Sequence, residues 1–449
     1  MNSFANIFKI PDLRRRILFT LGILVIYRVG VAIPIPGIDA AALQQLFKSQ
    51  SNNFLGFLDM FSGGALGRMS IFALGVMPYI NSSIIMSLLQ GAHVIPYLDR
   101  LAKEGETGRK QMNKITRYFT LLLALIQSYG LTTLITKITL PGEIAVVRDP
   151  GALFIFTTVI TLTTGTLFIM WLGEQITELG IGNGISLMIF TGIVDRFFPA
   201  AKNLIVDIFQ LQQRSIVGAL GLLAFILLVT GLVVWVETAQ RKIPVQYAKR
   251  MVGRKMYGGA STFLPLKVDQ SGVIAVIFAV SLLSVPVTFA SFNPDADLSK
   301  KVMGFWSGRH WWYETLYAAL IIFFCYFYNS VQFNPMDLAE NLKKWGGFIP
   351  GIRPGEPTAT YINTVLSRIT LGGALFVAAL AILPDLLHRF VNTPFYFGGT
   401  SVLITVGVAL DTIGQLESRL IMGHYEGFSK TGRVKGRWFN IGAGGGAGN

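Results

Sequence analysis

The stretch "DMFSGGALGRMSIFALGVMPYINSSIIMSLLQ" (residues 59–90) contains the pattern that decides the fold. Its first part, residues 59–67, is apolar and rich in glycine but too short to cross a bilayer, because a spanning helix needs about 20 residues. Arg68 separates this part from the uncharged run 69–92, which is long enough and contains Pro78. We expect either a re-entrant half-helix before a spanning helix or an interfacial helix lying flat on the membrane, and the sequence favours neither.

Further uncharged runs recur along the whole chain, which has 449 residues and is 52% hydrophobic. A large buried helical core would need amphipathic helices around it, and the sequence contains almost none. We therefore predict an all-α polytopic membrane protein with ten transmembrane helices. The candidate crossings are 17–33, 69–92, 118–136, 151–173, 179–194, 215–236, 270–290, 315–333, 369–384 and 394–410.

The distribution of positive charge predicts the orientation of these crossings. The chain has a net charge of +14, and most of its 38 lysines and arginines fall in the two termini and three intervening loops. Those loops are 98–117, 240–267 and 343–368. Because cytoplasmic loops are enriched in Lys and Arg, we expect both termini and these loops to be cytoplasmic. No small-residue cleavage site follows the first apolar run, so we expect the first helix to be retained.

Side chains that commonly perform catalysis or bind metals are sparse. Cys325 is the single cysteine, which excludes an internal disulfide and a cysteine-based metal site. The four histidines are scattered near predicted helix ends, and the sequence has no HExxH, GxSxG, P-loop or EF-hand pattern. We predict no catalytic residue, no metal and no cofactor.

The segment "QRKIPVQYAKRMVGRKMYGG" (240–259) holds six basic residues and no acidic one. The strand-like pieces "IPVQYA" and "STFLPLKV" lie before and after its glycines, which predicts a two-stranded hairpin projecting from the membrane. Topology and attraction to anionic lipids are the simpler explanation of such charge. We favour a docking surface for an anionic partner, and ribosomal RNA and an acidic protein face both fit.

Two further arginines stand in unusual surroundings. Arg353 lies in a loop, 341–362, whose three prolines and four glycines would hold it at a fixed place, although a solvated loop is the alternative. Arg28 lies inside or near the end of the first crossing. Snorkelling to the interface is the commoner explanation for such an arginine, and a partner carboxylate from another helix is the alternative.

Two aliphatic pairs follow breaks in the apolar pattern. Ile80 and Ile84 come just after a proline, and Ile185 and Ile189 follow the glycine-rich start of residues 180–190. Residues four apart share a helix face, so each pair presents one aliphatic surface. Such pairs usually face lipid or a protein core, but their recurrence beyond two breaks calls for a further explanation.

Eight long strings carry a resemblance to a known family. They are "IPIPGID" (33–39), "MFSGGALGRMSIFALGVMPYI" (60–80), "KEGETGR" (103–109), "MWLGEQITELGIGNGIS" (170–186), "QRKIPVQYAKRMVGRKMYGG" (240–259), "PLKVDQSGVI" (265–274), "NLKKWGGFIPGIRPGE" (341–356) and "PFYFGGTSVLI" (394–404). Over about residues 12–438 the chain resembles the SecY family, the central subunits of bacterial-type protein-conducting channels.

The resemblance implies a particular architecture and activity. Residues 1–200 (helices 1–5) and 201–422 (helices 6–10) would form two halves related as an inverted repeat, followed by a cytoplasmic tail, 423–449. The halves would open like a clamshell, with a lateral gate towards lipid. Such a channel translocates unfolded preproteins and releases hydrophobic segments sideways into the bilayer, driven by a SecA motor or the ribosome.

By position in the matching strings, the resemblance assigns four groups of residues. The pore ring, an aliphatic constriction, is Ile80, Ile84, Ile185, Ile189, Ile277 and Ile404. The plug segment, which would close the outer funnel, is Met60, Phe61, Ser62, Gly63, Gly64, Ala65, Leu66, Gly67 and Arg68. The lateral-gate residues are Ser82, Ser83 and Gln127. The docking residues, for SecA or the ribosome, are Arg241, Lys249, Arg250, Arg254, Lys255 and Arg353.

The resemblance also implies partners and a location. The partners are the SecE and SecG subunits, the SecA ATPase, the ribosome through its rRNA, a preprotein or signal sequence, and membrane lipids, with SecDF and YidC as further candidates. The location is the inner (plasma) membrane, with a thylakoid membrane as the alternative. A secondary transporter, which also uses broken helices and inverted repeats, is the competing function. It would need a polar midplane site, and an aliphatic ring is a poor one.

Two positions depart from the family pattern. Ala275 stands where the seventh helix usually has proline, and Leu179 stands where arginine is common. Alanine should leave the seventh helix straighter, because proline kinks helices. Leucine removes one cytoplasmic charge.

Overall fold

In a computed structural model, the protein is described over residues 10–39, 43, 59, 62–92, 95–137, 139–140, 144–145, 147, 149–209, 216–247, 250–252, 255–257, 261–293, 296–305, 311–391 and 399–431. The helices are α2 (Pro11–Ala32), α5 (Met77–Gly91), α6 (Pro96–Lys103), α7 (Glu106–Lys137), α8 (Ala152–Leu179), α9 (Gly184–Phe209), α10 (Ile216–Thr238), α11 (Gly272–Phe292), α12 (Asp297–Phe305), α13 (Trp311–Gln332), α14 (Pro335–Lys344), α15 (Glu356–Val391) and α16 (Gly399–Thr431). The strands are β1 (Thr139–Leu140), β2 (Ile144–Ala145), β3 (Gln240–Tyr247), β4 (Arg250–Val252), β5 (Lys255–Tyr257), β6 (Ser261–Lys267) and β7 (Gly347–Phe348).

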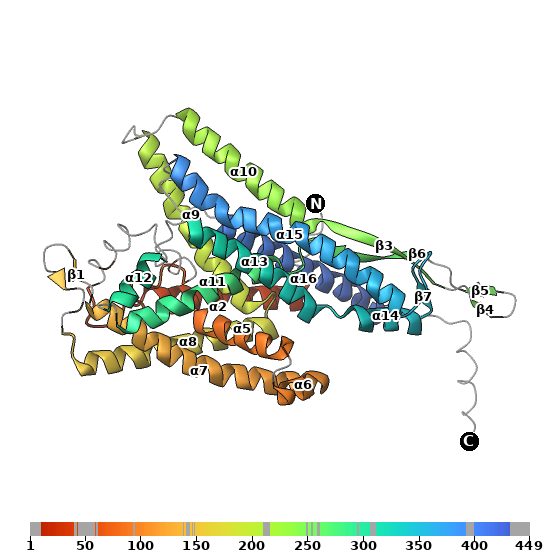
Figure 1. The fold of residues 1–449 in the computed structure, drawn as a ribbon, viewed down its shortest axis with the longest axis horizontal. Coiled ribbons are helices and arrows are strands. Elements are labelled where there is room, and N and C mark those ends of the chain that lie inside the picture. Colours follow the sequence, from red (N-terminus) through yellow and green to blue (C-terminus); the bar gives the residue numbers. More distant parts are fainter. Residues whose placement is uncertain are drawn as a thin grey trace, which may run out of the picture.

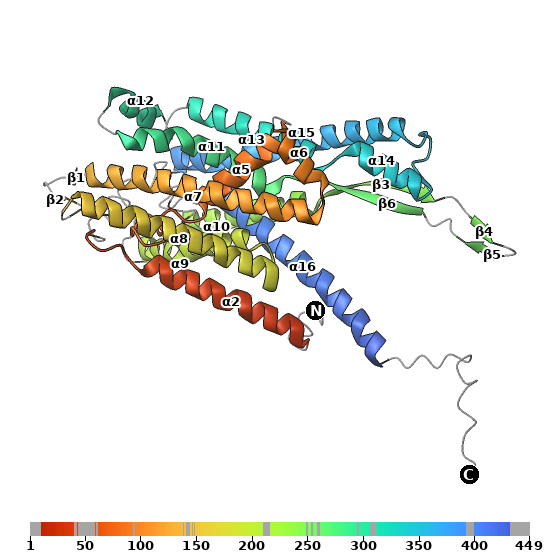
Figure 2. The ribbon, with the colours of Figure 1, turned by 90° about the horizontal axis from the view of Figure 1, so that it is seen from below.

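The long helices run together along the long axis of the molecule (Figures 1 and 2). The strands β3 and β6, the helix α14 and the start of α15 project at one end, and α12 and β1 lie at the other (Figures 1 and 2). The start of α2 and the end of α16 both point towards the side of the molecule where β3 and β6 project (Figure 2). The described ends of the chain therefore lie on the same side of the helical body.

The helices agree with the predicted membrane architecture. Each of the ten predicted crossings overlaps a described helix of at least 15 residues. Five described helices are long and apolar enough to span a bilayer on length and composition alone: Glu106–Lys137, Ala152–Leu179, Gly272–Phe292, Trp311–Lys344 and Glu356–Leu383. Several helices extend past the predicted apolar runs, because helical turns outside the hydrocarbon tolerate charge. Accordingly α9 continues beyond the predicted half boundary at residue 200, and α16 continues beyond 422.

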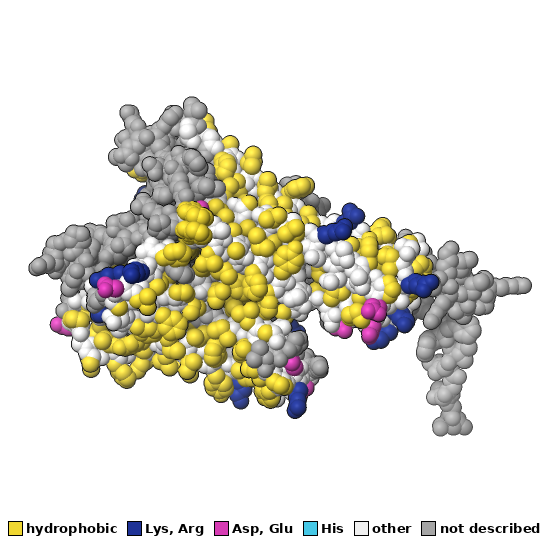
Figure 3. Space-filling model, viewed as in Figure 1, with side chains coloured by type: hydrophobic (Ala, Val, Ile, Leu, Met, Phe, Trp, Pro, Cys, Tyr) yellow, Lys and Arg dark blue, Asp and Glu magenta, His cyan; other side chains and the backbone are white. Residues whose placement is uncertain are grey.

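The outer surface of the described helices matches a membrane environment. Large apolar side chains such as Leu18 (60% exposed), Leu227 (64%) and Trp235 (72%) point outwards from α2 and α10. On the face drawn in Figure 3, hydrophobic side chains cover the middle of the molecule, and the charged side chains lie around the margin of this area. A belt of this size would be unfavourable in water, and it is the surface that lipid chains solvate.

The prediction of a half-helix over residues 60–68 is wrong for the described residues, 62–68. Residues 62–69 form consecutive turns, and Met60 and Phe61 lie outside the described residues. Gly63 (φ 67°) and Gly64 (φ 82°) adopt the left-handed conformation, which a right-handed helix cannot contain. The spanning helix α5 starts at Met77, with Pro78 in its first turn, where a proline needs no hydrogen-bond acceptor.

The segment nevertheless lies inside the protein. Ala65 is 0% exposed, Leu66 4% and Met69 0%. The interfacial alternative is therefore wrong, and a re-entrant segment with irregular backbone is the better description. Such backbone is tolerated at this depth because protein surrounds it.

The predicted basic hairpin is confirmed. Strand β3 pairs antiparallel with β6, from Gln240 opposite Lys267 to Gln246 opposite Ser261, and β4 pairs with β5 further along the hairpin. A third strand, β7, joins β3 through Gln246 opposite Phe348 and Tyr247 opposite Gly347. The two basic loops that the sequence analysis treats separately, 240–267 and 341–362, therefore contribute strands to one sheet.

A small apolar core fixes the base of this sheet. Its buried members come from β3, β6, α14, the residue after β7, and α15: Ile243, Val245, Leu266, Leu342, Ile349 and Ile362. Alternating burial along β3 places its apolar side chains on this core and its polar side chains in solvent. The base of the hairpin is consequently a fixed platform for the basic residues on it.

Candidate functional site

The six predicted pore-ring isoleucines all belong to, or pack against, one large apolar cluster of the helical body. They lie on α5, α9, α11 and α16, which come from both predicted halves. Five are buried members of one apolar cluster: Ile80 (6% exposed), Ile84 (3%), Ile189 (1%), Ile277 (8%) and Ile404 (0%). Ile185 is partly buried and packs against the same cluster. Isoleucines from four helices far apart in the sequence are thus part of one continuous apolar core.

The turn before α9 positions Ile185 and Ile189. Gly182 has a φ of 86°, which reverses the chain after α8. Asn183 Oδ1 then accepts hydrogen bonds from Ile185 N at 3.1 Å and Ser186 N at 3.3 Å, so that it caps the first turn of α9. The amide of Gly182 donates to Gln415 Oε1 at 3.0 Å, which ties this turn to α16, the helix of Ile404.

The plug segment lies against the central cluster. Ala65 is a member of the cluster that contains the isoleucines, while Leu66 and Met69 belong to a second cluster with Ile135 of α7 and Leu162 of α8. Arg68 is exposed. The buried turns therefore connect the centre of the body with two helices on its periphery.

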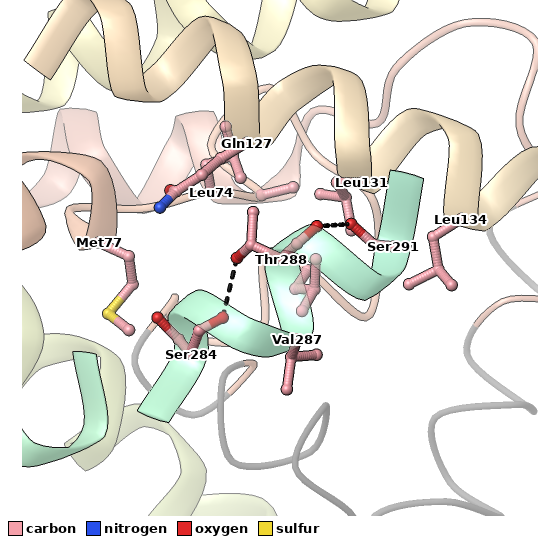
Figure 4. A pocket seen from close by; sticks show the side chains of 11 residues that line it. Leu74, Met77, Gln127, Leu131, Leu134, Ser284, Val287, Thr288 and Ser291 are labelled. Carbon is pink, nitrogen blue, oxygen red and sulfur yellow. Dashed lines mark hydrogen bonds between the residues drawn. The ribbon is translucent and has the colours of Figure 1, made fainter. Parts of the chain in front are cut away.

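The predicted lateral-gate residues fall in two different places. Ser82 Oγ donates to Thr116 O at 2.8 Å, so it joins α5 to α7 within one half and does not join the halves. Ser83 is partly buried on α5. Gln127 of α7 lines a cavity between α7 and α11, where its side chain lies opposite Ser284 and Thr288 (Figure 4). Gln127 is therefore the predicted residue that lies at the boundary between the halves.

This cavity is mainly apolar, and Leu66 of the plug segment is among the residues that line it. Its lining residues are Leu66, Ala73, Leu74, Met77, Gln127, Leu131, Leu134, Ser284, Val287, Thr288 and Ser291 (Figure 4). The hydroxyls of Thr288 and Ser291 donate to carbonyls of their own helix, at 2.9 and 2.6 Å (Figure 4). These hydroxyls therefore find their hydrogen-bond acceptors within α11 and need none in the cavity. The cavity is thus compatible with an apolar occupant.

Two residues at this boundary were missed by the sequence analysis. Thr133 Oγ1 of α7 donates to Ser291 O of α11 at 3.0 Å. A Cβ built on Gly130 would lie 2.6 Å from Ser291 Oγ, so the helices approach closely where α7 has no side chain. The GxxT spacing on α7 is the signal that could have located this contact, because small residues mark close helix packing in membranes.

The four predicted docking residues that the structure describes lie on the projecting hairpin or in the loop that β7 attaches to it. Arg241 is exposed on β3, Arg250 lies on β4 and Lys255 on β5. Lys249 and Arg254 lie outside the described residues. Arg353 is exposed between β7 and α15, and its carbonyl accepts a hydrogen bond from Thr358 Oγ1 at 2.8 Å. Pairing of β3 with β7 holds the loop of Arg353 on the same sheet as Arg241.

Asp269, between β6 and α11, is a buried carboxylate at the base of this sheet. It is 5% exposed; Oδ1 accepts from Gly272 N at 2.6 Å and from Ser271 Oγ at 3.3 Å, whereas Oδ2 has no hydrogen-bond partner. Burial raises the pKa of Asp269, and the hydrogen bonds from Gly272 and Ser271 and the charge of Lys267 oppose this rise.

We expect Asp269→Asn to stabilise the protein increasingly as the pH rises. A carboxyl whose folded-state pKa is raised loses stability as pH rises through that pKa, and Asn stays neutral while its Oδ1 still accepts both hydrogen bonds. The gain at pH 8 should be about 1 kcal/mol, seen as a higher midpoint of thermal unfolding in detergent. Asp269→Ala, which removes the acceptor, should be destabilised at pH 6 as well. Equal differences between wild type and Asp269→Asn at about pH 3, below the ordinary pKa of an aspartate, and at pH 8 would contradict the assignment.

Taken together, the long apolar helices, the aliphatic centre and the buried turn segment define a polytopic helical membrane channel. The SecY family profile matches residues 70–413. The chain belongs to the SecY family. It is 46% identical over 440 residues to the protein translocase subunit SecY of Escherichia coli (strain K12), which covers 95% of this chain and 96% of that protein.

Solved structures show the same fold at low sequence identity. A SecY channel described for its plug domain, which stabilises its closed state and maintains a membrane seal, has a TM-score of 0.65 at 17% identity, over 93% of this chain and 95% of that chain. The canine Sec61 channel in its ribosome complex from the endoplasmic reticulum has a TM-score of 0.59 at 17% identity, with the same coverage. The chain is therefore a multi-pass channel subunit of a protein translocase, and the secondary-transporter alternative is not supported.

Proposed function

We propose that Ile80, Ile84, Ile185, Ile189, Ile277 and Ile404 form the constriction through which an unfolded preprotein passes. The observation that supports this best is that four helices of both predicted halves contribute these isoleucines to one apolar cluster. A narrow aliphatic collar offers ions no substitute for their hydration shells, so it prevents leakage by dewetting. Its side chains make no specific contact, and a substrate of any sequence can therefore displace them.

The plug segment and the boundary between α7 and α11 have complementary proposed roles. The segment 60–68 closes the path on the outer side at rest. The apolar cavity beside Gln127 admits a hydrophobic segment, which then moves sideways into lipid because lipid is its lower-energy solvent. Hydrogen bonds between membrane helices contribute only about 0.6 kcal/mol on average, so a contact such as Thr133 with Ser291 holds the gate without locking it.

The basic sheet is the proposed docking site for the force-generating partner. Exposed Arg241 and Arg353 and the further docking residues Lys249, Arg250, Arg254 and Lys255 present positive charge to rRNA or to an acidic face of SecA. The fold likeness to the ribosome-bound Sec61 channel supports a ribosomal partner. SecE, SecG and a preprotein complete the proposed assembly, with SecDF and YidC as optional partners. The chain itself supplies a path and no catalysis.

We further propose that the projecting sheet and both termini are cytoplasmic. The excess of Lys and Arg in those segments supports this orientation, as does the position of the start of α2 and the end of α16 towards the sheet. The inner (plasma) membrane is the proposed location, with the thylakoid membrane as the alternative.

A disulfide between Gly130→Cys and Ser291→Cys should abolish signal-dependent opening. The built Cβ of Gly130 lies 2.6 Å from Ser291 Oγ, which is within reach of a disulfide and joins α7 to α11. With Cys325 replaced by Ser, oxidised protein in liposomes with SecA should lose preprotein translocation by at least about tenfold, and reduction should restore it.

The matched control joins two helices of one half. Ser128 Oγ of α7 lies 3.1 Å from Thr163 Oγ1 of α8, so cysteines at these positions should form a disulfide without effect on transport. Normal translocation by a fully oxidised Gly130–Ser291 pair would refute the proposed gate.

A further inference from the structure

The described part of the plug region is folded around one buried carboxylate. Asp59 is 8% exposed, and its Oδ1 accepts a hydrogen bond from Gly67 N at 2.7 Å. Ser62 Oγ donates to Asp59 O at 3.0 Å and accepts from Leu66 N at 3.1 Å. These bonds close the turns into a compact unit, and the second oxygen of Asp59 remains available to a partner outside it.

That partner is an arginine on α9, and the adjacent residue of α9 forms a second ion pair. Asp59 Oδ2 pairs with Arg196, and Asp195 pairs with Arg28 of α2. Arg28 Nη1 also donates to Gly63 O at 3.1 Å. The partner carboxylate that the sequence analysis considered for Arg28 is thus confirmed. Two neighbouring residues of α9, with opposite charges, hold the turns and α2 at one point.

The turns also rest directly on the backbone of α9. A Cβ built on Gly63 would lie 2.9 Å from Gly192 Cα, and Gly63 has a φ of 67°, so a larger residue fits neither the space nor the conformation. Tyr27 OH of α2 donates to Ser62 O at 3.4 Å. These contacts all come from α2 and α9, which belong to the predicted N-terminal half. Separation of the two halves at the α7–α11 boundary therefore leaves them intact.

We propose that the ion pairs Asp59–Arg196 and Arg28–Asp195, here called the plug latch, form a barrier to opening that is separate from the lateral gate. A signal segment that parts the gate must also release the latch before the path is clear. The latch residues are positioning residues that set both the tightness of the resting seal and the signal strength needed to open the channel. This inference rests on the plug role proposed above for residues 60–68.

The strength of the latch follows from unequal burial. The side chain of Asp59 is 12% exposed and that of Arg196 is 35% exposed. A buried carboxylate that loses its cation keeps its desolvation cost, whereas a partly exposed arginine is more readily solvated. Loss of Arg196 should therefore weaken the attachment by destabilising the closed position of Asp59.

Arg196→Gln should raise the resting ion conductance of the purified complex in planar bilayers by about tenfold, which corresponds to ~1.4 kcal/mol of lost closing free energy. Translocation of a preprotein with a weakened signal sequence should rise by a similar factor, while transport of the normal preprotein stays unchanged. Arg196→Lys, which keeps the charge, should restore both measurements to near wild type. A merely structural defect would instead reduce transport of both preproteins.

Matched variants separate the latch from the plug. Lys202→Gln removes an exposed cation of the same helix, α9, and should change neither measurement. Asp195→Asn, at the more exposed pair, should give a smaller effect in the same direction and serves if Arg196→Gln fails to accumulate. If deletion of residues 62–68 raises the conductance but Arg196→Gln and Asp195→Asn do not, the latch is refuted while the plug stands. If the deletion also leaves conductance unchanged, the plug role itself is refuted.

Discussion

Replacing Ile84 by Asn raises the resting ion conductance of the channel by at least about tenfold, because a polar amide in a dry aliphatic constriction favours a continuous column of water. Ile404→Asn has the same effect, since both side chains are almost fully buried in the central cluster, at 3% and 0% exposure. The conductance is measured in planar bilayers with the purified complex and no preprotein. Preproteins with weak signal sequences should pass more readily through the same variants.

A control on the same helix tests whether position decides the effect. Ile85 follows Ile84 but lies on another face of α5 and is only partly buried. Ile85→Asn should therefore leave the conductance near wild type, while Ile84→Val should retain the seal because it keeps an aliphatic side chain. Unchanged conductance in both Ile84→Asn and Ile404→Asn would remove the constriction from the six isoleucines.

The spanning helices could be predicted from the sequence because their signal is local. A run of about 20 uncharged residues suffices to identify a crossing, and each predicted run overlaps a described helix. The hairpin was equally accessible, because two strand-like pieces flank its glycines. The turns at residues 62–69 could not be predicted in the same way, because apolar composition alone does not reveal the left-handed glycines that prevent a half-helix.

Which residues make up the site depends on contacts between distant parts of the chain, and no local sequence pattern reveals those contacts. Periodicity identified Ile80 with Ile84 and Ile185 with Ile189, but Ile277 and Ile404 came from the family resemblance. Strand β7 has two residues, and its pairing with β3 is fixed by the core around Ile349.

The ion pairs were harder still to predict from the sequence. Arg28 stands out as an arginine in an apolar run, but its partner Asp195 lies on another helix far along the chain. The sequence analysis singled out Arg28 with snorkelling as the commoner explanation and a partner carboxylate as the alternative, and only the fold identifies the partner. Asp59 and Arg196 did not stand out in the sequence, and only the fold shows the ion pair by which they connect a glycine-rich turn with α9.

Reversing Arg353 to Glu should reduce SecA-driven translocation by at least about tenfold, while the protein still inserts and folds. Arg353 is exposed, and its side chain contributes nothing to the buried core beneath the sheet, so the substitution acts on docking. An acidic partner face that was attracted would then be repelled, and like charges across an interface cost several kcal/mol. Translocation is measured in liposomes with SecA, and SecA affinity is measured separately at low and at high salt.

The salt dependence distinguishes docking from a general defect. Screening weakens the repulsion between exposed charges, so part of the lost SecA affinity of Arg353→Glu should return as ionic strength rises, whereas wild-type affinity should fall. Arg368→Glu reverses another exposed arginine, on α15 beyond the loop, and should behave as wild type. Normal translocation by Arg353→Glu, or a defect of equal size in Arg368→Glu, would mean that Arg353 holds no special place in the docking surface. A loss of translocation with unchanged SecA affinity would assign Arg353 to a step after docking, since binding and force transmission would then depend on different residues of the sheet.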